Sequence, residues 1–219
     1  MVTANVNGHK IRIPERFTID EWCALQKFDF DAPLQWPQIL EHITDISASV
    51  YRQADEESLQ LFMGFVITAM NARKRVELPD FNKLNFGQFV DLDCYVSIGI
   101  DKHIKDMLTI LETDTPWAPQ ALWSIEQFIL WRTSVYRRYA QLFGLEDKDF
   151  KDFVEEQDEQ DPMAVSRGWY NVIVELAGED LLKMDQITEE PLDKVLTFLQ
   201  IKKEKQIAAA QEARKLRKV

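Results

Sequence analysis

Any chemistry in this chain would have to come from three histidines, two cysteines and scattered carboxylates. The histidines fall in three separate predicted elements, and none has a second ligand at the spacing of an HExxH or CxxC site. The glycines form no GxGxxG loop, P-loop or GxSxG elbow. The sequence therefore predicts no catalytic residues, no cofactor and no metal, and we interpret the chain as a non-enzyme. The histidines are His9, His42 and His103.

Two groups of aspartates have to be considered as a calcium site or as a carboxylate pair that shares one proton. Three aspartates fall within residues 147–152, but Lys151 occupies the fifth position of that calcium-loop pattern and the required glycine is missing. Asp91 and Asp93 lie two residues apart in a predicted helix, so they point to different sides and cannot share one proton. Neither group predicts a calcium site or an acid–base pair.

The cysteines and the apolar runs indicate the compartment. Cys23 and Cys94 sit in apolar-periodic segments, which favours two small core residues in a reducing cytoplasm over a disulfide framework. The N-terminal residues lack the basic start and the apolar region of a secretory signal. The densest apolar run, residues 61–67, is too short to cross a bilayer. We expect a soluble, intracellular protein with no membrane partner.

The charge is strongly negative and unevenly distributed. A formal net charge of −11 repels a bare phosphate backbone, which makes nucleic acid a poor partner. Residues 146–161 hold nine acids and two lysines, whereas residues 202–218 hold seven bases and two acids. Each run is typical either of a solvated surface or of a docking surface for a partner, and the sequence leaves both interpretations open.

Local patterns predict the elements of the N-terminal half. Residues 2–13 alternate around an Asn-Gly pair, which predicts a β-hairpin because both turn positions need positive φ. A capping box that begins at Thr18 starts the next helix, and a second box joins Asn85 to Gln88. The helix capped by Asp55 is apolar on most sides, so we expect it in the middle of the core.

The C-terminal half is predicted to contain three longer helices and a short helix within the acidic stretch 146–161. One is predicted over residues 119–143, and another begins at Pro162 and closes at Gly178. Thr188 is the expected cap of the last one. Beyond residue 201 the apolar face thins out, so residues 202–219 are expected to form a projecting helix or a frayed tail.

These elements predict a mainly α fold with two lobes and a small N-terminal β-hairpin. The rigid, proline-rich joint near residues 113–119 marks the boundary between the lobes. The expected domains are therefore an N-terminal lobe over residues 1–113, a C-terminal helical lobe over residues 114–201, and a basic helical tail over residues 202–219.

One predicted helix mixes bases and aromatics, namely Arg132, Arg137 and Arg138 with Tyr136 and Tyr139. Such a mixture is typical of an RNA-binding surface. It is equally typical of a helix whose aromatic face is buried and whose arginines cover its edge. Because the chain is acidic, we favour the second interpretation, and a nucleic-acid-associated helical protein stays as the alternative function.

Residues 84–93, LNFGQFVDLD, resemble the signature (I/L)-T-F-G-x-(F/W/Y)-I-(D/E)-L of the tail and baseplate-hub assembly proteins of tailed bacteriophages. Asn85 stands where threonine is common, and both residues cap helices. Residues 169–180 and 195–199 are similar to the C-terminal half of related phage virion and tail-assembly proteins, in which a last helix runs into a basic tail. The family has no catalytic residues to carry over.

The resemblance implies an interaction role in virion assembly. The chain would act in the host-cell cytoplasm as a tail or baseplate-hub assembly chaperone, or stay in the virion as a structural component of the tail, neck or capsid interior. Its partners would be other phage virion or tail proteins, and a homo-oligomer stays open. The expected partner-binding residues are Phe86, Phe89, Asp91, Trp169, Tyr170, Lys202, Lys203, Lys205, Arg214, Lys215, Arg217 and Lys218.

Overall fold

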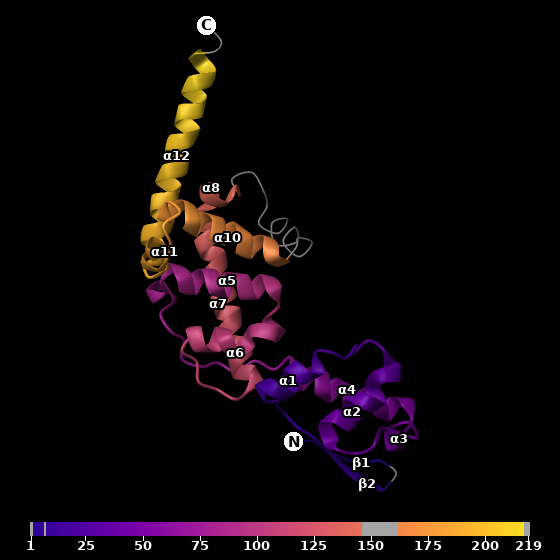
Figure 1. Cartoon of the computed structure of the whole chain (residues 1–219). Coiled ribbons are helices and arrows are strands. Elements are labelled where there is room, and N and C mark those ends of the chain that lie inside the picture. The colour runs from indigo at the N-terminus through magenta and orange to yellow at the C-terminus, as the bar shows by residue number, and fades with distance from the viewer. Residues whose placement is uncertain (1, 7, 146–161, 217–219) are drawn as a thin grey trace. The chain divides into compact units, whose positions relative to one another are not determined.

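The structure is a computed structural model that describes residues 2–6, 8–145 and 162–216. This part of the chain is mainly helical, which confirms the predicted fold class, and its strands lie at the N-terminus (Figure 1). Within these ranges, no helix combines the length and the apolar character that crossing a membrane requires. The elements are β1 Val2–Val6, β2 His9–Ile13, α1 Ile19–Leu25, η1 Pro33–Gln35, α2 Trp36–Thr44, α3 Ala48–Tyr51, α4 Glu56–Met70, η2 Phe81–Lys83, α5 Phe86–Ile98, α6 Ile100–Ile110, α7 Ala118–Arg138, α8 Ala140–Phe143, α10 Pro162–Ala177, α11 Leu181–Thr188 and α12 Leu192–Leu216.

The chain divides into two compact units. Unit 1 consists of Met1–Leu78 and Ile104–Glu126, and unit 2 consists of Pro79–His103 and Gln127–Val219. Each unit therefore combines segments that are far apart in the sequence.

This division does not coincide with the predicted lobes, which meet at residues 113–119. That joint lies within unit 1, where Thr18 and Trp117 form an antiparallel β-bridge. The backbone N–H of Ala118 also donates to the carbonyl of Phe17 at 3.0 Å. The prolines of the joint do break the helical pattern, but nothing in their spacing shows which distant segment the joint pairs with.

Unit 1 begins with the predicted hairpin, in which β1 and β2 pair in antiparallel fashion. Val6 pairs with His9, and Gly8 has a φ of +83°, which a residue without a Cβ adopts readily. Ile11 and Ile13 are 0% and 1% exposed, whereas the residues that alternate with them on β2 are exposed. Strand β2 therefore contributes one apolar face to the core.

The first helix of unit 1 starts as the sequence predicts. The Thr18 hydroxyl accepts a hydrogen bond from the Glu21 N–H, and the Glu21 carboxylate accepts one from the Thr18 N–H at 2.7 Å. This reciprocal pair satisfies two backbone N–H groups that a helix start otherwise leaves without acceptors. Leu25, on the buried side of α1, is 0% exposed.

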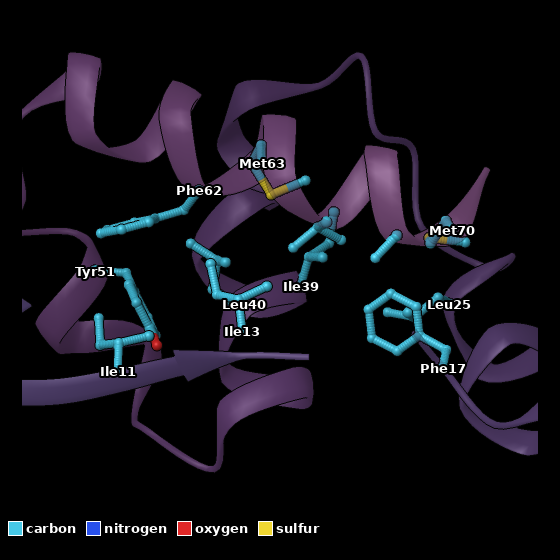
Figure 2. Packing of buried hydrophobic residues seen from close by; sticks show 12 residues of the cluster. Ile11, Ile13, Phe17, Leu25, Ile39, Leu40, Tyr51, Phe62, Met63 and Met70 are labelled. Atoms are coloured by element: carbon cyan, nitrogen blue, oxygen red, sulfur yellow. The ribbon is translucent and has the colours of Figure 1, made fainter. Parts of the chain in front are cut away.

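Helix α4 packs on the core through one face. Asp55 caps it by accepting from the Ser58 N–H at 2.8 Å, as predicted. Burial on most sides is not observed, because Leu61 and Ile67 are 59% and 38% exposed. Figure 2 shows Phe62 and Met63 of α4 beside residues of α2, α3 and β2. The buried cluster comprises Ile11, Ile13, Phe17, Leu25, Ile39, Leu40, Tyr51, Phe62, Met63, Val66, Ala69 and Met70.

Helix α5 organises unit 2, where it contacts α10, α11 and α12. Its predicted capping box is complete: the Gln88 N–H donates to Asn85 Oδ1 at 2.7 Å, and the Asn85 N–H donates to Gln88 Oε1 at 3.0 Å. The same end of α5 is tied to the segment before α12, because the Phe86 N–H donates to the carbonyl of Glu190 at 2.8 Å. Gly99 ends the helix with a φ of +137°.

Two predicted helix boundaries in unit 2 are wrong. The helix predicted over residues 119–143 is interrupted at Tyr139, whose φ of −110° and ψ of 34° separate α7 from α8. Thr188 is the last residue of α11 and does not cap α12, since its hydroxyl donates back to the carbonyl of Asp185 at 2.8 Å. Asp180 caps α11, a helix that the sequence pattern does not predict. A hydroxyl between two helices can donate to a carbonyl of the preceding helix or accept from an N–H of the following one, and local sequence does not decide between the two.

Gly87 lies where α5 approaches the end of α11. A Cβ at this position would stand 2.9 Å from the Cβ and 3.2 Å from the carbonyl oxygen of Thr188. Gly87→Ala should therefore lower the free energy of unfolding by about 1–3 kcal/mol, because backbone must shift. At Gly64 in α4 a Cβ would meet nothing within 4 Å. Because alanine is a better helix former than glycine, Gly64→Ala should raise the free energy of unfolding by about 0.5–1 kcal/mol. Urea unfolding followed by circular dichroism measures both values, and changes of the same sign would contradict this account.

Candidate functional site

The histidines and cysteines form no metal site within the described ranges. His9 and His42 are exposed, and the ring of His103 stacks on Tyr95 with centroids 4.5 Å apart. Across the residues that the structure describes, no three His, Cys, Asp or Glu side chains could hold a metal ion together. Neither Cys23 nor Cys94 forms a disulfide, and burial raises the pKa of Cys94, which disfavours its thiolate.

A charged network lies in unit 2 instead, around Asp93 of α5. Asp93 is fully buried, and its carboxylate pairs with Nε of Arg132 on α7. The hydroxyl of Tyr136 lies 2.8 and 2.9 Å from the two carboxylate oxygens, and Nε1 of Trp169 on α10 donates at 2.6 Å. Side chains from two helices, α7 and α10, therefore converge on one carboxylate of α5. We call these four residues the Asp93 network.

Helical spacing explains why these charges are buried. Asp93 lies four residues after Phe89, so both point to the buried side of α5. On α7, Arg132 lies four residues after Phe128 and four before Tyr136, and all three are buried. A buried charge is costly unless it is paired and hydrogen-bonded. Asp93 and Arg132 can therefore be buried only because each pairs with the other.

The electrostatics of the network indicate a structural role. Burial alone would lower the pKa of the Arg132 guanidinium, but the carboxylate of Asp93 and the hydroxyl of Tyr136 outweigh this effect, and the pKa is raised. The guanidinium therefore stays charged. Three donors occupy the Asp93 carboxylate, which leaves it poorly placed to accept a proton from a substrate. We conclude that the network holds α5, α7 and α10 together.

Tyr136 makes the stability of unit 2 sensitive to alkaline pH. Burial raises the pKa of Tyr136 well above its usual value of 10.0, and the charge of Asp93 raises it further. The folded state keeps the phenol proton where the unfolded chain releases it, so this contribution to stability is complete below pH 10.0 and declines above it. The decline should reach about 1.4 kcal/mol per pH unit. Urea unfolding across this range should show a smaller decline in Tyr136→Phe than in the unaltered chain, and equal slopes would contradict the assignment.

A pocket of about 440 Å³ lies beside the Asp93 network, within unit 2. Its size is typical of sites that bind small molecules. Its apolar lining consists of Leu142, Phe143, Val165, Trp169, Val172 and Leu199, and Gly168 also faces it. Its polar lining consists of Glu175, Lys202, Lys203 and Gln206, together with the buried Asp93 and Tyr136.

Two lysines of α12, Lys202 and Lys203, line the pocket. Nζ of Lys202 pairs with the Glu175 carboxylate of α10 at 2.7 Å. Nζ of Lys203 donates to the carbonyls of Gln141 and Leu142, at 2.6 and 3.0 Å. Because cations interact favourably with the carbonyl end of a helix, Lys203 fastens α12 to α8.

The structure brings together only some of the predicted partner-binding residues. Trp169, Lys202 and Lys203 line the same pocket. Phe86 and Phe89 are fully buried, because the face of α5 that carries them packs inside unit 2. They are core residues in this fold and present no surface to a partner.

The remaining predicted partner-binding residues are exposed or lie outside the described ranges. Tyr170 is 57% exposed, and Asp91 is also exposed, although partial desolvation raises its pKa. On α12, the predicted residues Lys205, Arg214 and Lys215 are exposed. Arg217 and Lys218 lie outside the described residues, as does the acidic run 146–161 with its aspartates.

Sequence reasoning missed the Asp93 network. It assigned Arg132 to the edge of a helix, whereas Arg132, Tyr136 and Tyr139 are all buried. These three side chains therefore form no exposed RNA-binding surface. The available signal was a charged residue at helical spacing within an apolar face, which is true of both Asp93 and Arg132.

No protein-family model, curated protein or solved structure matches this chain. The resemblance to phage tail and baseplate-hub assembly proteins therefore stays a hypothesis, supported by residues 84–93 and by the two C-terminal segments. The function has to be inferred from the exposed surface of α12 and from the pocket beside the Asp93 network.

Proposed function

We propose that this chain is a non-enzymatic protein-interaction protein and that the exposed part of α12 is its partner-binding surface. The observation that carries the proposal is the exposure of every side chain from Glu204 to Lys215, although α12 stays helical to Leu216. Helices in proteins usually gain their stability by packing one face. A partner on this segment would supply the burial that the described part of the chain does not provide.

The side chains of this segment suit a helical or grooved partner. Ala208–Ala210 and Ala213 are small, which lets a second helix approach closely. Ile207 adds an apolar side chain that is 37% exposed. Arg214 and Lys215 lie in the last turn and would complement acidic residues of the partner. The mode of recognition would be helix-face docking.

The resemblance supplies the class of partner. We infer that the partners are other phage virion or tail proteins and that the chain acts in virion assembly. It would hold a component in the host-cell cytoplasm as a chaperone, or stay in the particle as a structural protein. A second copy of the chain is the competing occupant, since residues 202–218 carry +5 and the remainder carries −16.

A truncated chain tests the surface. Deleting residues 207–219 leaves the pocket lining intact, so the far-ultraviolet circular dichroism and thermal midpoint of the remaining fold should change little. Co-purification with virion proteins, quantified by mass spectrometry, should fall by at least about tenfold relative to the full chain. The double variant Arg214→Gln, Lys215→Gln should lower co-purification in part. Lys183→Gln on α11 also removes an exposed charge and is the matched control.

The same measurement separates the two assembly roles. A fixed number of copies in purified particles would indicate a structural component. Complexes present in infected-cell lysate and absent from particles would indicate a chaperone. Unchanged co-purification of the truncated chain would show that α12 is not the surface. If the full chain retains no virion protein in either preparation, the assembly role is wrong.

A further inference from the structure

We propose that the pocket lined by α8, α10 and α12 in unit 2 binds an aliphatic monocarboxylate of medium chain length, with its hydrocarbon chain between the apolar walls and its carboxylate at Lys203. Of the residues that line this site, only Gln206 belongs to the exposed surface of α12 that begins at Glu204. It would be a small-molecule site in addition to the proposed partner-binding surface.

The walls favour a hydrocarbon chain. Val165 and Val172 on α10 are half-buried, and Leu199 on α12 completes an aliphatic surface that faces the pocket. Each methylene transferred from water onto such a surface should strengthen binding by about fourfold. A partner helix is about 10–12 Å across with its side chains, which is too wide for this volume. A single extended chain fits better.

The charges favour one carboxylate at the other end. Arg132 neutralises Asp93, and Glu175 neutralises Lys202. The ammonium of Lys203 instead uses two of its three donors on neutral backbone carbonyls of the described residues. Its charge and its third donor are therefore available for one anionic group, and a charge-assisted hydrogen bond there would be stronger than a neutral one.

Calorimetric titration of the full chain with hexanoate, octanoate and decanoate tests the hydrocarbon part. The dissociation constant should fall by about 16-fold for each added pair of methylenes. Absence of binding by all three acids, or an affinity that does not depend on chain length, would overturn the proposal. Decanol tests the head group and should bind about tenfold more weakly than decanoate. Equal affinities for the two would overturn the assignment of the carboxylate to Lys203.

A pair of glycine variants tests the location. Gly168 lies within α10 and lines the pocket, and a Cβ there would meet nothing within 4 Å. Gly168→Leu should therefore keep the fold, because leucine is a better helix former than glycine, and occupy the space of the ligand. Decanoate affinity should fall by about tenfold or more. Gly64→Leu makes the same change in α4 of unit 1 and should leave the affinity unchanged. Equal affinity of both variants would place the ligand elsewhere.

A pair of lysine variants tests the anion contact. Lys203→Gln keeps donors for the two carbonyls but removes the charge, so decanoate affinity should fall by about tenfold and decanol affinity should not change. Lys205→Gln removes an exposed charge from the same helix outside the pocket lining and should change neither affinity. Loss of affinity for both ligands in Lys203→Gln would assign the residue a structural role and contradict the anion contact.

Discussion

Asp93→Ala is expected to lower the free energy of unfolding by about 3–5 kcal/mol. The substitution removes the carboxylate partner of Arg132, a residue that is only 6% exposed. It also removes the acceptor that Tyr136 and Trp169 share. A buried charge that loses its carboxylate, and two buried donors that lose their shared acceptor, each cost free energy. Urea unfolding followed by circular dichroism measures the loss.

Asp91→Ala is the matched control, because Asp91 lies two residues away on the same helix and is exposed. Its free energy of unfolding should stay within about 0.5 kcal/mol of the unaltered chain. A similar change in both variants would show that the Asp93 network contributes nothing specific.

A double variant separates the ion pair from the rest of the network. Asp93→Ala combined with Arg132→Met should be more stable than Asp93→Ala alone, since no uncompensated charge is then buried. The two single losses should therefore fail to add, with a coupling of about 0.5–3 kcal/mol. Additive losses would mean that Asp93 and Arg132 stabilise the fold independently of each other.

The sequence predicts the features that short-range contacts decide. The capping boxes at Thr18 and Asn85 each join residues three positions apart, and both are present in the structure. The hairpin turn and the Gly99 helix end are local in the same sense. The break at Tyr139 is not predicted, because the helical pattern of apolar residues continues through it.

The candidate site could not be predicted in the same way, because its contacts are long-range. The partners of Asp93 follow it by 39, 43 and 76 residues, at Arg132, Tyr136 and Trp169. Periodicity shows that Asp93 and Arg132 lie on apolar faces, but it does not show that these faces meet. The pocket could not be predicted for the same reason, because its lining residues come from separate helices and residue spacing does not show which helices pack together.

Phe89→Ala should lower the free energy of unfolding by about 3–5 kcal/mol, because the change leaves a cavity among aromatic rings. Phe89 is fully buried, and its ring centroid lies 5.9 Å from that of Trp169 and 6.0 Å from that of Trp131. Phe89→Leu keeps more of the volume and should cost less. Urea unfolding measures both variants.

This experiment decides what residues 84–93 encode. If Phe89 were a partner-binding residue, Phe89→Ala would weaken partner binding and leave stability within about 0.5 kcal/mol. Tyr170→Ala is the control: Tyr170 is 57% exposed, so this substitution should leave the free energy of unfolding unchanged. The structure explains the segment by packing: Asn85 and Gln88 cap α5, Gly87 lets α11 approach, and Phe89 fills the core. A resemblance in these positions would then report a shared way of starting and packing a helix, and the binding specificity would reside on other surfaces such as α12.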